Sequence, residues 1–280
     1  MKIKIISDST CDLSPAQIAS LDITLAPLTV VKGDEQFKDG VTITPAEIFE
    51  HVANGGALCS TSANSIGEYA DIFEQYANDY DGIIHISLGS GFSTCFQSAT
   101  LAAEDFPNVR VIDSQNLSTG QGLVVLKACE LAKTATDLDT LANDLRAFTE
   151  KVEASFLVDK LDYLVKGGRC SSAAALGANL LNLKPCIEVK NGKMGVTKKY
   201  RGNYAKCLAN YVREKLADRD DIDRTTLFVT QTVVSDECNA AVQEAINAYG
   251  HFENIYETTA GCTISCHCGP GTLGILFVRK

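Results

Sequence analysis

The first half of the chain repeats one order of pattern, a short apolar run followed by a segment that begins like a helix. The runs Lys2–Ser7, Asp81–Ile86 and Val109–Ile112 are apolar and end near polar residues, as buried strands do. Three helix starts combine a hydroxyl cap with Glu or Gln three residues later: Ser14-Pro15-x-Gln17, Thr44-Pro45-x-Glu47 and Ser65-x-x-Glu68. This succession predicts a parallel sheet with right-handed crossovers and flanking helices.

The pattern after residue 122 predicts a buried helix and then a second group of strands and helices. Leu123–Leu131 is apolar nearly all round, which predicts a helix buried between layers. Asn191-Gly192 joins the strand-like runs Leu183–Lys190 and Lys193–Thr197, a strong hairpin signal. Further strands are predicted at 227–230, 254–257 and 273–278, and helices at about 203–217 and 235–249. We therefore predict an α/β protein with an N-terminal parallel-sheet domain (1–153), a C-terminal α+β domain with a mixed or antiparallel sheet (154–280), and a cleft between them.

Composition narrows the possible partners. The formal net charge is −10, which disfavours nucleic acid and anionic membranes because both reward clustered Lys and Arg. No apolar stretch reaches the roughly 18 residues expected of a spanning helix. At the start of the chain, the run Ile5-Ile6 is too short for the apolar region of a signal peptide. We expect a cytoplasmic protein.

The chain has 11 cysteines, an odd number in a chain of 280 residues. Buried, reduced thiols are the default in such a protein. The tract Cys262, Cys266, His267 and Cys268 raises the alternative of a zinc site, but it lacks the paired Cys-x2-Cys knuckles that structural zinc prefers. We therefore predict no metal.

A small-residue turn follows the strand at Asp81–Ile86. Ile86–Thr94 reads ISLGSGFST, so hydroxyls and free backbone N–H groups collect where a helix begins, at the carboxyl end of a parallel strand. Open α/β sheets bind ligands at such places, and an anion suits a helix start. Ser93 alone reads as a helix cap. A second hydroxyl-bearing turn, Ser60-Thr61-Ser62, favours an anion site between the two.

A nucleophilic serine is the competing interpretation. Ser93 or Ser90 could act with His267 as base in an acyl hydrolase, since triads assemble from distant positions. However, the tract Gly89-Ser90-Gly91-Phe92-Ser93 does not match the Gly-x-Ser-x-Gly elbow of α/β hydrolases.

Two arginines each allow two interpretations. Arg169 closes the turn Lys166-Gly167-Gly168-Arg169, and Arg201 follows Lys198 and Lys199. Either could be a solvated surface residue. Either could instead bind a phosphate or carboxylate, which the guanidinium fork matches.

Taken together, the motifs resemble the DegV family over nearly the whole chain. The similar segments are Ser7–Leu13 (SDSTCDL), Phe37–Gly40, Thr61–Ser65, Ile86–Ser98, Val111–Gly122, Leu161–Arg169 (LDYLVKGGR), Leu181–Pro185 (LNLKP) and Cys266–Gly274. The departures are mild: Asn64 replaces a common Pro, and Thr94, Cys95 and Phe96 replace the usual Gly, Thr and Tyr. All of them leave the hydroxyl of Ser93 in place.

The resemblance implies a function. DegV proteins hold a long-chain fatty acid, such as palmitate, stearate or oleate, in a tunnel between two domains, and several present it to a fatty-acid kinase. By position, Thr61 and Ser93 would bind the carboxylate, with His267 beside it and Arg169 and Arg201 near the head group or the kinase. Ser62, Thr94 and Gly269 complete the expected site. We expect a monomeric, non-catalytic carrier without a cofactor.

Overall fold

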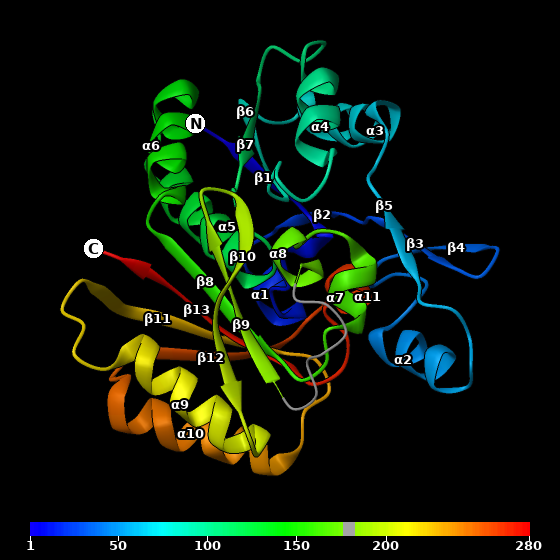
Figure 1. The fold of residues 1–280 in the computed structure, drawn as a ribbon. Coiled ribbons are helices and arrows are strands. Elements are labelled where there is room, and N and C mark those ends of the chain that lie inside the picture. Colours follow the sequence, from blue (N-terminus) through cyan, green and yellow to red (C-terminus); the bar gives the residue numbers. More distant parts are fainter. Residues whose placement is uncertain (176–182) are drawn as a thin grey trace.

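The N-terminal half is built on a parallel sheet, as predicted. The computed structural model describes residues 1–175 and 183–280. Four strands lie in the order β2-β1-β6-β7, and all pair in parallel (Figure 1). Their bounds are β1 Ile3–Asp8, β2 Thr24–Ala26, β6 Gly82–Ser87 and β7 Val109–Asp113. Their carboxyl ends point toward the centre of the molecule, where the loops after β1 and β6 meet the second sheet.

Helices cover both faces of this sheet. On one side α3 (Ile66–Ala77) packs on α4 (Cys95–Ala103), and on the other α5 (Thr119–Ala132) packs on α6 (Leu138–Thr149). All three predicted capping boxes form, at Ser14 before α1 (Pro15–Ser20), at Thr44 before α2 (Pro45–Ala53) and at Ser65 before α3. Each satisfies two backbone N–H groups that a helix start would otherwise leave open.

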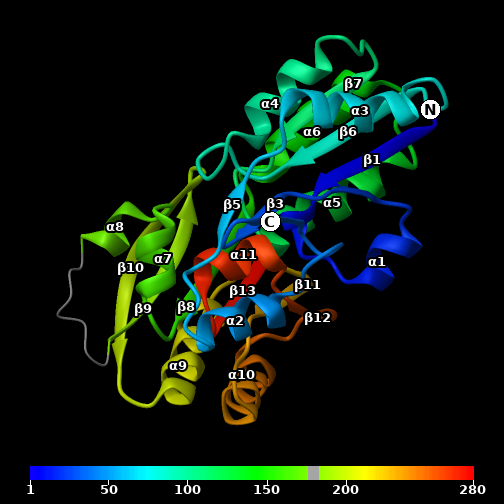
Figure 2. The same ribbon diagram turned by 90° about the vertical axis from the view of Figure 1, so that its right-hand side faces the viewer.

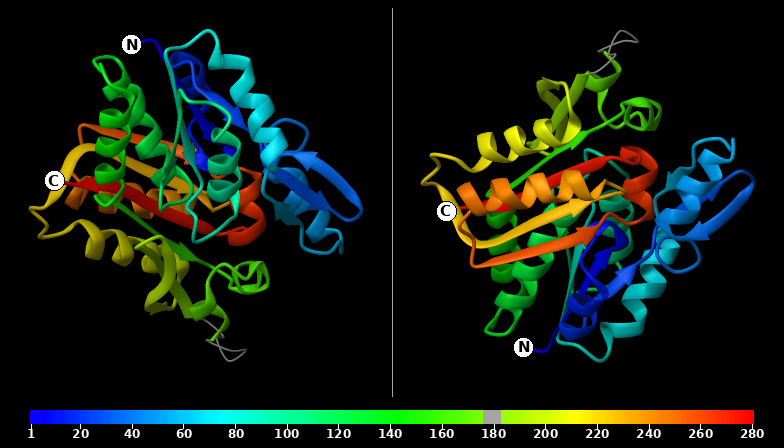
Figure 3. Two further views of the ribbon diagram at one scale, coloured as in Figure 1. Left: turned by 90° about the horizontal axis from the view of Figure 1, so that it is seen from above. Right: turned by 90° about the horizontal axis from the view of Figure 1, so that it is seen from below.

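A six-stranded mixed sheet forms the second layer, in the order β10-β9-β8-β13-β11-β12. Strands β11 and β12 pair in parallel, and the other neighbours pair antiparallel. The strands are β8 Val152–Val158, β9 Leu183–Lys190, β10 Lys193–Arg201, β11 Ile222–Gln231, β12 Asn254–Thr259 and β13 Thr272–Arg279. Helices α9 (Tyr204–Leu216) and α10 (Asp236–Tyr249) cover its outer face, as Figure 3 shows from above and below.

Helix α5 is shared between the two sheets. Its neighbours include β1 and β6 of the parallel sheet and β8 and β13 of the mixed one. The side chains of β8 and β13 alternate between two hydrophobic cores. Phe156 and Leu276 lie in the core around α5, whereas Leu157 and Ile275 lie in the core under α9 and α10. The prediction of a helix buried between layers is confirmed.

A third, small sheet was not predicted. It has the antiparallel order β4-β3-β5, with β3 Thr29–Lys32, β4 Glu35–Lys38 and β5 Ser60–Ser62. The interpretation of Ser60–Ser62 as a turn was therefore wrong. It is an edge strand in which Thr61 pairs with Val30; it lies at the right-hand side of the molecule in Figure 1 and faces the viewer in Figure 2.

The predicted hairpin of β9 and β10 is confirmed, with positive φ at Asn191 (51°) and Gly192 (69°). Leu181 and Asn182 of the LNLKP motif lie outside the described residues. The short helices α7 (Asp162–Gly167), α8 (Ser171–Ala174) and α11 (Cys262–Cys268) complete the fold. Within residues 1–175 and 183–280, every helix is too short or too polar to cross a membrane.

The turn between β9 and β10 contacts the Gly/Ser segment that follows β6, and this contact can be tested by mutation. A Cβ on Gly91 would lie 2.0 Å from the carbonyl oxygen of Gly192, so Gly91→Ala must separate the two segments. We expect a loss of about 1–3 kcal/mol in the free energy of unfolding, measured by urea denaturation. The control is Gly67→Ala in α3, where a Cβ meets nothing within 4 Å. That change should be neutral or stabilising, and equal losses in both variants would contradict the contact.

Candidate functional site

A cavity of about 50 Å³ lies where the two sheets approach each other. Its wall comes from the segment after β6, from β5, from α11 and from β10 of the hairpin. Most of the lining is apolar, and the polar exceptions include Thr61, Ser93, Arg169 and His267. The other lining residues are Leu28, Ala63, Leu88, Phe92, Leu117, Leu164, Met194, Thr263, Ile264 and Cys268.

Thr61 and His267 meet at one side of this cavity. The Thr61 Oγ1 lies 2.8 Å from His267 Nε2, which joins β5 to the last turn of α11. The other ring nitrogen, Nδ1, has no hydrogen-bond partner in the described part of the chain. Burial, followed by the nearby Arg169 charge, lowers the pKa of His267 from 6.5 to about 4. The imidazole is therefore neutral at physiological pH.

Ser93 faces the same cavity from the segment that leads into α4. Its Oγ accepts a hydrogen bond from the backbone N–H of Cys95 (3.3 Å) and lies 3.0 Å from the Cys95 Sγ. Ser93 thus binds the N–H of the first helical residue from one position ahead of the N-cap, which is Thr94, and it also lines the cavity. Because sulfur is a weak acceptor, the hydroxyl proton of Ser93 can turn to a stronger one.

Arg169 supplies a positive charge at the cavity. Its guanidinium hydrogen-bonds the carbonyl oxygens of Phe92 (3.4 Å) and Gly167 (2.8 Å). Among the residues that the structure describes, it has no carboxylate partner. A guanidinium held by carbonyl groups keeps its full charge available to an anion.

The remaining predicted site residues do not line the cavity. Ser62 is exposed and donates to its neighbour Ala63 O. Thr94 is the exposed N-cap of α4, and Gly269 ends α11 at a φ of 73°, against the ring of Tyr163. Arg201 is exposed at the end of β10.

The structure gives the nucleophilic serine little support. The hydroxyl of Ser90 is exposed and donates to Asp113 Oδ2 (2.5 Å). The ring of His267 is engaged with Thr61, and within the described residues it hydrogen-bonds neither Ser90 nor Ser93. Neither serine therefore has the imidazole base that the hydrolase interpretation requires.

The cysteines are structural. All 11 are buried and unpaired, which confirms the sequence-based expectation of buried thiols. Burial raises the pKa of Cys262 and of Cys268 to about 12, so both are protonated thiols. In residues 1–175 and 183–280, no group of three or more His, Cys, Asp or Glu side chains is arranged to hold a metal ion.

A second cavity of about 30 Å³ continues from the first between α5 and the mixed sheet. The two share Leu117, Ile264 and Cys268 as walls. Several hydroxyl residues border it, but their oxygens are engaged elsewhere: Ser118 Oγ donates to Asp12 Oδ2 (2.5 Å), Ser155 Oγ lies 2.7 Å from the Tyr211 hydroxyl, and Thr230 Oγ1 lies 2.5 Å from Thr119 Oγ1. With its oxygen paired, Thr230 can present its methyl group to the cavity.

Comparisons with known proteins identify the family of the chain. Residues 2–280 match the family described as "Uncharacterised protein, DegV family". The chain belongs to the DegV family. A DegV domain-containing protein of Deinococcus radiodurans is 32% identical over 98% of both chains.

Two solved DegV structures are similar over the full length of both chains. One is a Thermus thermophilus DegV family protein described by its fatty acid binding (TM-score 0.92, 30% identity). The other is DegV of Bacillus subtilis, described as a fatty acid binding protein (TM-score 0.82, 29% identity). These DegV structures confirm the predicted fold class.

The sequence did not identify the apolar lining of the DegV cavity. Leu28, Phe92, Leu117, Leu164, Met194 and Ile264 come from six separate segments. Apolar periodicity could mark such residues as buried, but it could not assign them to one cavity.

The depressed pKa of His267 predicts a pH dependence of stability in the lipid-free protein. Between pH 6.5 and about 4 the unfolded chain takes up a proton that folded His267 does not, so stability falls as the pH falls. The full effect is about 3 kcal/mol. Urea unfolding of His267→Gln across this window should show a shallower decline than the wild type. Parallel declines would mean that His267 is not the group responsible.

Proposed function

We propose that this protein binds one long-chain fatty acid, with its carboxylate at Thr61 and Ser93 and its acyl chain running from the first cavity toward the second. The observation that carries the proposal is that a mostly apolar cavity gathers the Thr61 and Ser93 hydroxyls and an arginine without a carboxylate partner on its wall. Ligand sites of this kind use few polar groups for orientation and apolar surface for affinity. Palmitate, stearate and oleate are suitable ligands.

The hydrogen bond between His267 and Thr61 supports placing the ligand carboxylate at Thr61. If neutral His267 carries its proton on Nε2, it donates to Thr61 Oγ1 and leaves the Thr61 proton free for the ligand. Ser93 can add a second donor, since its proton rests only on sulfur. Arg169 offsets the negative charge that would otherwise be costly to bury.

The acyl chain requires the cavities to open. About 10–15 Å³ of such space admits one water molecule, so the two cavities together hold only a few waters. The shared wall of Leu117, Ile264 and Cys268 must move aside. Burying each CH₂ group contributes about 0.8 kcal/mol, which over a long chain exceeds the cost of reorienting a few side chains.

The relatives support the same ligand class, since the similar Thermus thermophilus and Bacillus subtilis proteins are described as fatty acid binding. We further propose that the two halves, 1–153 and 154–280, act as the two domains around the ligand. A reducing cytoplasm suits 11 buried thiols without a disulfide.

The fatty acid would be a substrate for a partner. We propose that this protein is a monomeric carrier and that a separate fatty-acid kinase phosphorylates the bound carboxylate. The exposed basic residues Lys199 and Arg201, two positions apart on one face of β10, would face that partner. Lys198 points to the other face, where it pairs with Glu214 (2.7 Å).

Ser93→Ala tests the carboxylate site. The change removes a donor to a charged group, so the Kd of lipid-free protein for stearate should rise by a factor corresponding to about 1.5–3 kcal/mol. The matched control is Ser90→Ala, three residues away and outside the cavity, which should bind normally. Titration calorimetry measures both, together with mass spectrometry of an organic extract of the purified protein. No lipid in the extract and no binding of added stearate would overturn the proposed function.

Arg201→Ala tests the partner surface. Stearate affinity should be unchanged, because Arg201 does not line the cavity, while the rate of acyl phosphate formation by a fatty-acid kinase should fall. The control is Arg146→Ala on α6, another exposed arginine. Equal phosphorylation rates for Arg201→Ala and the wild type would remove Arg201 from the docking surface.

A further inference from the structure

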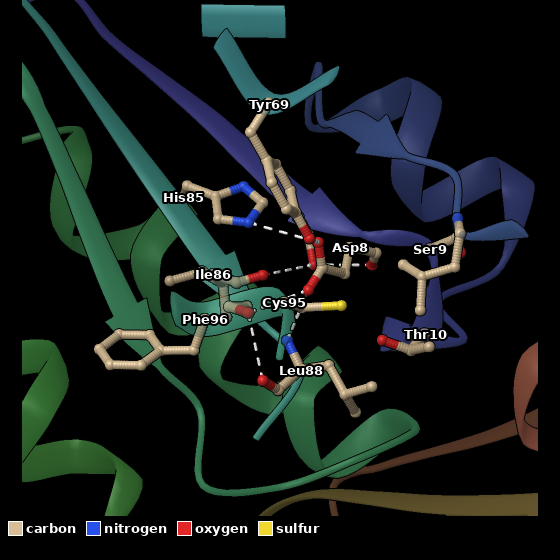
Figure 4. A network of polar contacts seen from close by, with 12 residues as sticks. Asp8, Ser9, Thr10, Tyr69, His85, Ile86, Leu88, Cys95 and Phe96 are labelled. Carbon is tan, nitrogen blue, oxygen red and sulfur yellow. Dashed lines mark hydrogen bonds and ion pairs between the residues drawn. The ribbon is translucent and has the colours of Figure 1, made fainter. Parts of the chain in front are cut away.

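The end of β1 contains a carboxylate that the proposed function leaves without a role. Asp8 is fully buried, with 0% of its surface exposed. Figure 4 shows Tyr69, His85 and Leu88 arranged around it. Burying a charge is costly unless hydrogen bonds replace its water, so the donors around Asp8 call for a functional explanation.

One oxygen of Asp8 holds the start of the segment that carries Ser93. Asp8 Oδ2 accepts hydrogen bonds from the backbone N–H of Leu88 (2.8 Å) and from Ser87 Oγ (3.0 Å). These two residues lie where β6 ends and the Gly/Ser segment begins. The exit of this segment from the sheet is therefore fixed by a charged acceptor, which makes stronger bonds than a neutral one.

The other oxygen reaches the end of the same segment. Asp8 Oδ1 accepts from the Tyr69 hydroxyl (2.7 Å). The same oxygen lies 3.3 Å from His85 Nε2. The Tyr69 hydroxyl also lies beside the Cys95 side chain (Figure 4), and the Cys95 Sγ is 3.0 Å from Ser93 Oγ. The ring of Tyr69 cannot swing away, because it packs on Phe73 and His85 with centroids 6.2 and 5.2 Å distant.

One of these bonds has a fixed direction. A carboxylate only accepts, so the single proton of Tyr69 points to Asp8. Between Ser93 Oγ and Cys95 Sγ either atom can donate. When the Ser93 proton turns to a ligand carboxylate, a stronger acceptor than sulfur, the Cys95 S–H can donate to the Ser93 oxygen in its place. The series Asp8, Tyr69, Cys95 and Ser93 thus connects the buried carboxylate to the site.

We infer that Asp8 is a positioning residue for the carboxylate site, which holds the start of the segment Leu88–Cys95 directly and its end through Tyr69, and so keeps Ser93 at the cavity. The inference rests on the proposed function. Asp8 itself does not line the cavity.

The experiment is a double-mutant cycle with lipid-free protein and stearate, read as Kd by calorimetry. Tyr69→Phe keeps the buried ring and breaks the link between Asp8 and Cys95. We expect Tyr69→Phe to weaken binding about three- to tenfold when Ser93 is present, as loss of one hydrogen bond would. In the Ser93→Ala background the same change should have no further effect, because the group that Tyr69 positions is gone.

The matched control is Tyr200→Phe. Tyr200 is another buried tyrosine, its hydroxyl donates to Glu214 Oε2 (2.6 Å) in the core under α9, and it lines neither cavity. It should lower the Tm without changing the Kd. If Tyr69→Phe does not fold, Cys95→Ala takes its place in the cycle and breaks the same chain one step nearer to Ser93.

Each outcome decides between two roles. Equal weakening by Tyr69→Phe in both backgrounds, or no weakening in either, would overturn the positioning role of Asp8 and leave the fatty-acid site intact. If Ser93→Ala alone leaves the Kd unchanged, the carboxylate assignment in the proposed function fails first, and the role of Asp8 fails with it.

Discussion

The candidate site depends on how one short helix is held. Helix α11 has seven residues, too few to be stable alone, yet it supplies Thr263, Ile264, His267 and Cys268 to the cavity. Two buried carboxylates fix its start. Asp39 accepts from the N–H groups of Cys262 (2.9 Å) and Thr263 (3.3 Å), and Asp12 accepts from that of Gly261 (2.9 Å). Negative groups at a helix start satisfy free N–H groups and suit the helix dipole. Burial, together with the charge of Asp39, raises the pKa of Asp12 to about 8. The pair Asp12 and Asp39 therefore carries a single negative charge more readily than two.

At the other end of α11, the helix dipole and burial have opposite effects on the pKa of His267. His267 lies in the last turn, where the helix dipole favours a protonated imidazole by at most about 2 kcal/mol. Burial and the charge of Arg169 act in the opposite direction and bring the pKa to about 4, a larger effect of about 3 kcal/mol. The imidazole is therefore neutral, and it can serve Thr61 as a hydrogen-bond partner while Arg169 supplies the positive charge.

Much of the fold could be predicted from local pattern, and the failures have a common cause. The capping boxes and the Asn191-Gly192 turn succeeded because their signals lie within a few residues. Strand β5 was missed because its three residues are polar and pair only with β3, about thirty residues earlier. Helix α11 was missed because its stability comes from Asp12 and Asp39, which are more than 200 residues away in sequence.

The sequence likewise predicted only some of the residues that line the candidate site. Thr61, Ser93, Arg169 and His267 are brought to one cavity, whereas Ser62 and Thr94 are only their neighbours in sequence. Successive side chains of a strand point to opposite faces, so Ser62 cannot share the direction of Thr61. A family motif thus identifies a segment, and the backbone geometry decides which of its residues reaches the cavity.

Helix α11 also connects the two halves of the proposed ligand. Its last turn places His267 at the carboxylate end, and Ile264 and Cys268 form part of the wall between the two cavities. An acyl chain that enters the second cavity must therefore press on the helix that positions His267. Because Asp12 and Asp39 hold the first turn of α11 firmly, adjustment is easier at Leu117, which precedes α5, or in the side chains of Ile264 and Cys268 than in the helix axis. Because Asp12 and Asp39 fix α11, the acyl chain would displace side chains of the cavity wall, while the residues around the carboxylate would keep their positions.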